Sequence, residues 1–149
     1  MENVLRAAAR AFTSEEHLRN ILDSAAEWLE LYDENGTRLE GIRGRVGARG
    51  LTAEGAEIGV DMIEMDPGSG FPLHVHPGDH VLYGVEGRGG VIVNDEFHPI
   101  EPGTTVFIAA DQPHAVRGPD RDRFRFLAFG VPHEHLSSTN RMQLLEEPG

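Results

Sequence analysis

Three histidines that could bind a metal lie within seven residues of one another. His74, His76 and His80 stand in the run GSGFPLHVHPGDH. Because a strand sends residues two apart to the same face, His74 and His76 can aim at one point. Pro77 and Gly78 disfavour a helix after them and favour a tight turn, and this turn would fold His80 back towards the first pair. The spacing predicts a chelate of imidazole nitrogens.

A fourth histidine, His114, follows the loop in PGTTVFIAADQPHAVRG and begins another short apolar run. In a jelly roll, a strand this far along the chain can pair beside the strand that carries His74 and His76. We therefore expect all four imidazoles to converge inside a β-barrel.

The composition limits the remaining chemistry. The chain of 149 residues has no cysteine, and all thirteen of its positively charged side chains are arginine. Schiff bases, thiolate nucleophiles, disulfides and sulfur-ligated metals are thereby excluded. A bound ion is then the only strong electrophile, so no catalytic residue is assigned beyond the metal centre.

The formal net charge of −12 disfavours binding to a phosphate backbone. Arg43, Arg45 and Arg49 form the best candidate basic patch, and it is small. No apolar run approaches the length of a membrane span, and the N-terminus lacks the pattern of a signal peptide. We expect a cytoplasmic protein with no nucleic-acid or membrane partner.

Short apolar segments bounded by Gly, Pro, Asn or Asp predict an all-β domain. The first spans 57–65, where Ile58, Val60 and Met62 alternate with Gly59, Asp61 and Ile63. The others are expected at about 72–76, 80–86, 90–94, 104–108, 114–117 and 123–130. Their close spacing favours an antiparallel sandwich or barrel.

The N-terminal third predicts helix and irregular structure. Residues 2–12 form a short alanine-rich segment with helix propensity. Thr13 and Glu16 fit a capping box, and an amphipathic helix is expected to follow from about residue 14. Its apolar positions are Leu18, Ile21, Leu22, Ala25 and Leu29. Residues 28–32 could form its last turn or the first arm of a hairpin. The run GIRGRVGARG fits no phosphate-binding template, so we interpret it as irregular strand and loop.

The two histidine segments resemble the paired motifs of the cupin family. The first family motif is Gly, five residues, His-any-His, three or four residues, Glu, six residues and Gly. The sequence matches it with Gly68, His74, His76, His80 in place of the glutamate, and Gly87. The second motif is matched by Gly103 and His114. Here Ala109 replaces its proline, Asp111 its glycine and Gly118 its asparagine. The resemblance covers about residues 55–131.

The resemblance implies a double-stranded β-helix, the cupin jelly-roll barrel, with a short N-terminal helical segment. It divides the chain into an N-terminal extension (1–50), the barrel (51–131) and a C-terminal tail (132–149), and it implies a homodimer. It also implies one divalent metal on three histidines and a further ligand, here His74, His76, His114 and His80. A nitrogen-only site favours Fe, Zn, Ni or Cu, with Mn less favoured, and should attract a small anionic molecule.

Two further groups of side chains lie near this expected site. Four aromatics could line a pocket above the metal: Phe71, Tyr83, Phe107 and Phe126. His133 and His135 repeat the His-any-His spacing and could bring a second ion or reach the barrel mouth, but a polar tail after the last strand is the favoured interpretation. The tail from residue 132 onward is expected to be mobile or to lie on a neighbouring molecule. Because ligation requires neutral imidazoles, metal occupancy is expected to fall through about pH 6.5.

Whether the protein is an enzyme stays open at this point. One hypothesis is a mononuclear non-haem metal enzyme, of dioxygenase type or using Lewis-acid chemistry on a small anionic or enolisable substrate. A second is a non-enzymatic metal or ligand sensor. A third is a metal-free cupin of the sugar isomerase or epimerase kind, with histidine as the base.

Overall fold

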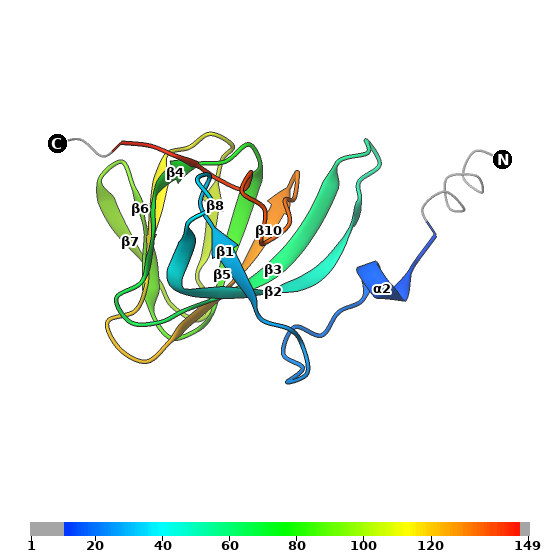
Figure 1. The fold of residues 1–149 in the computed structure, drawn as a ribbon, viewed down its shortest axis with the longest axis horizontal. Helices are drawn as coiled ribbons and strands as arrows, with labels where there is room; N and C mark the ends of the chain where they lie inside the picture. The colour runs from blue at the N-terminus through cyan, green and yellow to red at the C-terminus, as the bar shows by residue number, and fades with distance from the viewer. Residues whose placement is uncertain (1–10, 147–149) are drawn as a thin grey trace.

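The computed structural model describes residues 11–146, which fold into two antiparallel sheets that form a barrel (Figure 1). The six-stranded sheet has the order β1-β2-β3-β10-β5-β8, and the five-stranded sheet has the order β11-β4-β9-β6-β7. The strands are β1 (Leu29–Tyr32), β2 (Arg38–Leu51), β3 (Glu57–Met65), β4 (Gly70–Val75), β5 (Asp79–Glu86), β6 (Gly89–Val93), β7 (Glu96–Ile100), β8 (Thr105–Ile108), β9 (His114–Arg117), β10 (Phe124–Val131) and β11 (Gln143–Leu144). The all-β jelly-roll prediction is confirmed.

Seven expected strands are present within two residues of their expected bounds, and β7 was not predicted. A tight turn at Asn94 and Asp95, which have φ values of 53° and 63°, joins β6 to β7. Two successive residues with positive φ give the turn that matches the twist of a two-stranded hairpin. His98 lies on β7 opposite Val91.

The core lies between the two sheets. It is built from buried apolar side chains of nearly every strand: Leu31, Ile42, Ile63, Met65, Phe71, Leu82, Val91, Ile100, Ile108, Val116, Phe124, Phe126, Ala128, Leu136 and Met142. β2 and β3 pair over most of their length and extend beyond the barrel as a long hairpin (Figure 1).

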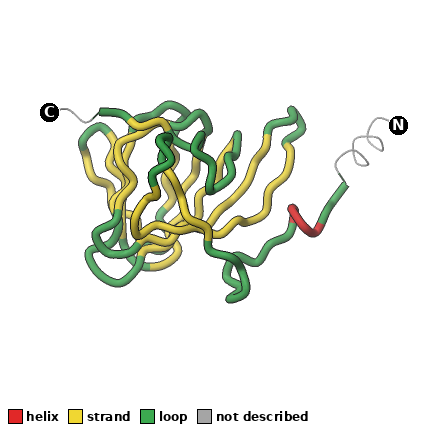
Figure 2. Tube along the Cα trace, viewed as in Figure 1, coloured by secondary structure: helices red, strands yellow, loops and turns green. Residues whose placement is uncertain are grey.

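A short helix begins at residue 14 as expected, but the prediction that it continues as an amphipathic helix is wrong. The only helix among the described residues is a single turn, α2 (Ser14–His17), as Figure 2 shows. Leu18 and Leu22, assigned to its apolar face, are each 63% exposed. The chain instead continues to β1, whose Leu31 is fully buried, so residues 28–32 form the first arm of a hairpin with β2. Sheet pairing outweighs a helical pattern too short to be stable alone.

Part of the expected N-terminal extension therefore belongs to the six-stranded sheet. β2 runs to Leu51 and crosses the expected boundary at residue 50. Residues 2–10 of the alanine-rich segment lie outside the described residues. Among the residues that the structure describes, none forms a helix of the length and apolarity that a membrane crossing requires.

The arginines of the GIRGRVGARG run are engaged within the sheet. Arg43 forms ion pairs with Glu64 and Asp66. The guanidinium of Arg45 stacks 4.1 Å from the centre of the Trp28 ring, and Arg45 is only 7% exposed. Arg49 lies 3.7 Å from Glu16 and 3.8 Å from Glu57. All three arginines of the candidate basic patch are therefore engaged in contacts within the protein.

The C-terminal segment packs on the barrel of its own chain. Leu136 is fully buried and Met142 is 4% exposed. β11 pairs with β4, so Leu144 lies opposite His74. The sequence analysis had expected a tail that is mobile or lies on a neighbouring molecule. For residues 132–146 the structure instead shows a segment that crosses one end of the barrel (Figure 1).

Candidate metal centre

Two neighbouring strands and the turn after one of them bring three histidines together. His74 on β4 lies directly opposite His114 on β9, and His76 follows at the end of β4. One ring nitrogen from each of these three residues lies within 4.8 Å of the others. His74 and His114 are each 3% exposed. The predicted convergence is confirmed for this histidine triad.

Backbone carbonyls hold the rings in place. The Nδ1 atom of His74 lies 2.6 Å from the Pro72 carbonyl, and that of His114 lies 2.8 Å from the Gln112 carbonyl. The Nδ1 atom of His76 lies 3.0 Å from the Gly78 carbonyl. A carbonyl can only accept, so each neutral ring donates from Nδ1 and keeps the lone pair on Nε2. This backbone contact is the usual way in which a metal-binding histidine is oriented.

The lone pairs of two rings face each other. Nε2 of His76 lies 3.2 Å from Nε2 of His114. Two unprotonated nitrogens at this distance repel each other unless a cation lies between them. Nitrogens bound tetrahedrally to one zinc ion at ordinary bond lengths would lie about 3.3 Å apart. The donor set therefore fits a transition-metal ion.

Burial keeps the imidazoles neutral. It lowers the pKa of His76 to about 4, with the charge of His114 adding to the effect. Burial also lowers the pKa of His114, and it lowers that of His74 well below the ordinary value. Proton competition for the nitrogens then begins below the pH of about 6.5 given in the sequence analysis, so the expected loss of metal moves to more acidic solution.

His80 lies beside the triad but outside the group of three. Its ring centre is 3.9 Å from that of His76, and its Nδ1 is 3.1 Å from the Gly78 carbonyl. That carbonyl thus accepts from both His76 and His80. Burial lowers the pKa of His80 to about 3, with the charge of His76 adding to it. Its role as a fourth ligand stays a prediction.

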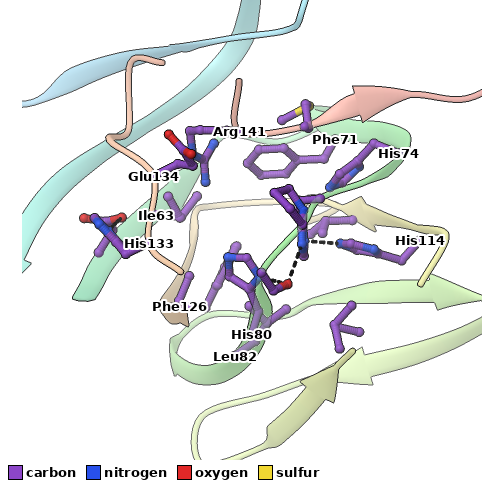
Figure 3. Close-up of a pocket in the computed structure, with 18 of the residues that line it drawn as sticks. Ile63, Phe71, His74, His80, Leu82, His114, Phe126, His133, Glu134 and Arg141 are labelled. Atoms are coloured by element: carbon purple, nitrogen blue, oxygen red, sulfur yellow. Dashed lines mark hydrogen bonds and ion pairs between the residues drawn. The ribbon is translucent and has the colours of Figure 1, made fainter. Parts of the chain in front are cut away.

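A pocket opens beside the histidines (Figure 3). Two of the four predicted aromatics, Phe71 and Phe126, line it. Tyr83 and Phe107 are 41% and 65% exposed and do not belong to the lining. Their neighbours in sequence, Leu82 and Ile108, face the pocket. Side chains of consecutive strand residues point to opposite faces, so Tyr83 and Phe107 point away from it.

Sequence reasoning missed three polar residues of this pocket, Asp61, Glu134 and Arg141, and it gave His133 a place at the barrel mouth only as the less favoured alternative. Nε2 of His133 lies 2.8 Å from Oδ2 of Asp61, and both side chains are almost fully buried. The expected polar tail is thus wrong for His133, whereas His135 is exposed. The alternation in 57–65 gave no signal for Asp61, which shares its face with Ile63 rather than with Met62.

Comparison with known proteins supports the fold. A family model of the cupin domain matches residues 61–139. No curated protein sequence gave a significant match. A cupin-2 domain from Rhodospirillum rubrum is 19% identical, with a TM-score of 0.65, over 89% of this chain and 83% of that one.

Two other similar structures carry functional names. KdgF from Halomonas sp. is 17% identical, with a TM-score of 0.62, over 78% of this chain and 94% of that one. The polyketide cyclase RemF from Streptomyces resistomycificus is also 17% identical, with a TM-score of 0.61, over 78% of this chain and 80% of that one. Identities this low establish a shared fold alone. The family model spans more than half of the chain, and the two sheets enclose a histidine triad at the matched motifs; the protein belongs to the cupin family.

Proposed function

We propose that this cupin is a mononuclear metal enzyme that acts on a small anionic substrate. The observation that carries the proposal is the pair of Nε2 atoms of His76 and His114, which face each other at 3.2 Å with their Nδ1 atoms committed to carbonyls. A bound ion would supply Lewis acidity, or with iron the activation of dioxygen.

The donor set favours particular ions. The triad offers imidazole nitrogen alone, which suits Fe, Zn, Ni or Cu better than the oxygen-preferring Mg or Ca. Neutral ligands leave the double positive charge of the ion uncompensated. At the pocket wall the positive charge of Arg141 is opposed by the negative charges of Asp61 and Glu134. The charge of the ion therefore carries the argument for an anionic substrate.

The size of the pocket supports a small substrate. The cavity has a volume of about 60 Å³. Ile63, Leu82 and Phe126 form an apolar wall that limits water around the reacting groups.

The test is metal-dependent turnover. The protein loaded with Fe(II), Zn, Ni or Cu is assayed with small oxo- and hydroxy-carboxylates, diketones and phenolic acids, and dioxygen uptake is recorded. We expect turnover that is lost on chelation and in His76→Gln. The matched control is His98→Gln, since His98 is an exposed histidine on β7. Absence of turnover with every metal would leave the sensor hypothesis.

The metal-free isomerase hypothesis makes the opposite prediction. It needs one histidine base, and the pair of His133 with Asp61 could serve as that base. Activity of this kind would survive chelation and the loss of His76 while depending on His133.

A further inference from the structure

One wall of the pocket is polar and lies away from His114. Asp61 comes from β3, His133 follows β10, and Arg141 precedes β11. Figure 3 shows His133 and Arg141 on the opposite side of the pocket from His114. Glu134 lies beside Arg141 on the same wall. A ligand that enters the pocket therefore meets histidines at one end, and two acids and a guanidinium at the other.

Asp61 has one oxygen fixed and one oxygen free. Oδ2 lies 2.8 Å from Nε2 of His133, while Oδ1 is buried without a hydrogen-bond partner in the described part of the chain. The side chain is 5% exposed. A buried acceptor left without a donor is costly and rare in folded proteins. Oδ1 is thus placed to accept a hydrogen bond from a ligand.

His133 is a positioning residue for Asp61. Its side chain is 7% exposed, and its backbone NH donates to the Glu57 carbonyl. The ring packs directly on Gly59, where an added Cβ would lie only 2.8 Å from ring atoms. Glycine at this position therefore makes room for the ring, whose Nε2 contacts the Asp61 carboxylate.

Arg141 offers the complementary donor. Its Nη1 is sealed from solvent and has no partner among residues 11–146. Burial lowers the pKa of this guanidinium, and the negative charges of Asp61 and Glu134 oppose that effect. An arginine remains charged even so. Nη1 can only donate, so its matching group is an anionic oxygen.

We propose that Arg141 and Asp61 together select a small hydroxy-carboxylate. Nη1 of Arg141 donates to the carboxylate, and Oδ1 of Asp61 accepts from the hydroxyl group. The inference rests on the proposed function, because it assigns the substrate class of the same pocket. A carboxylate without a hydroxyl leaves Asp61 without a donor, and a neutral alcohol leaves Arg141 without an anion.

The pocket contains a natural reporter for ligand binding. Met142 lines it, whereas Met62 lines a separate surface hollow with Leu22 and Leu127. The chain has four methionines, so ¹³C-methyl methionine labelling gives a simple spectrum. Titrations compare lactate with lactamide, which lacks the charge, and with propionate, which lacks the hydroxyl group. Each is run on zinc-treated and on metal-free protein.

We expect lactate to shift the Met142 methyl signal at concentrations about tenfold lower than either analogue, and to leave Met62 unmoved. A tenfold difference in concentration corresponds to about 1.4 kcal/mol, which is close to the energy of a hydrogen bond to a charged group. Arg141→Gln should abolish the preference for lactate over lactamide. Asp61→Asn should abolish the preference for lactate over propionate, and His133→Gln should reduce it. Arg88→Gln, which changes an exposed arginine with a 66% exposed side chain, should alter neither preference.

Equal binding of the three compounds by wild-type protein would overturn the inference, as would an unchanged lactate preference in Arg141→Gln. If Arg141→Gln does not fold, Arg141→Lys is the second variant. It keeps the positive charge but lacks the guanidinium that carries Nη1, so it should weaken lactate binding. Zinc content measured in the same samples separates the two proposals. Zinc uptake without ligand preference contradicts only the inference, and ligand preference without zinc uptake contradicts only the metal function.

Discussion

Nε2 of His76 lies 3.2 Å from Nε2 of His114, although 38 residues separate them in the chain. The contact follows from the antiparallel pairing of β4 with β9, which places His74 opposite His114 and leaves His76 at the strand end. The pairing brings three donors together before any ion binds. Such preorganisation lowers the entropy cost of metal binding.

Acid should destabilise the metal-free protein. The pKa values of His76 and His80 fall to about 4 and about 3 in the folded state. The unfolded chain, with histidine pKa values near 6.5, binds more protons below that pH, so the free energy of unfolding falls as the pH drops from about 6.5 towards 4. Urea unfolding of metal-free protein at a series of pH values measures this slope.

His80→Gln is the matched variant for this slope. Removing one titrating ring should make the dependence shallower between pH 6.5 and 4, while exposed His98→Gln should leave it unchanged. A free energy of unfolding that is flat across this range would contradict the lowered pKa values.

The part played by His80 can be tested through its contact with Gly130. An added Cβ at Gly130 would lie 2.9 Å from Nε2 of His80. If His80 is a ligand, both His80→Ala and Gly130→Ala should weaken zinc binding. Gly130→Ala displaces the His80 ring, and its zinc affinity should fall by about 10- to 100-fold, as when the orientation of other metal ligands is disturbed. A zinc titration against a competing chelator gives the affinities. Unchanged affinity in both variants would show a site of three histidines.

Glu64 holds a group of arginines on the six-stranded sheet. Its side chain is 4% exposed and contacts Arg43, Arg123 and Arg125. Glu64→Gln removes the compensating charge from a part-buried network, in which Arg43 and Arg123 are 32% and 48% exposed, and we expect a loss of roughly 2 kcal/mol in the free energy of unfolding. Glu40→Gln removes one exposed partner of Arg38 and should change it by less than about 1 kcal/mol. Equal effects in urea unfolding would contradict the assigned difference.

The C-terminal segment should contribute to the core. Leu136 is fully buried, and an added Cβ at Gly44 of β2 would lie 2.8 Å from it. Leu136→Ala should cost about 2–5 kcal/mol, whereas Leu22→Ala, at a 63% exposed position, should cost little. Thermal and urea unfolding provide the comparison. A Leu136→Ala protein as stable as wild type would mean that the segment does not pack as described.

The strands and the triad could be predicted because both depend on local patterns. Alternation of apolar residues marked β3, and the His-any-His spacing brought two histidines of the triad together. The same rule of alternation, applied strictly, would have excluded Tyr83 and Phe107, since Leu82 and Ile108 occupy the inward positions. It does not find Asp61, because alternation marks Ile58, Val60 and Met62 as the apolar face, whereas Asp61 is buried and Ile58 is 45% exposed.

Other features depend on contacts between distant parts of the chain. The spacing of Leu18 and Leu22 fits a helix, yet the sheet gains more from pairing β1 with β2. His133 has no local signal for burial, because its partner Asp61 lies 72 residues away. Sequence likewise gives no measure of oligomeric state, and the homodimer stays a prediction.

The most direct test of the account is the metal content of untagged protein purified without added metal or chelator, measured beside His114→Gln and His98→Gln. The account predicts close to one transition-metal ion per chain in the wild type and in His98→Gln, and loss of the ion in His114→Gln. Wild-type protein that carries no metal and takes up none at neutral pH would contradict it, as would full occupancy in His114→Gln.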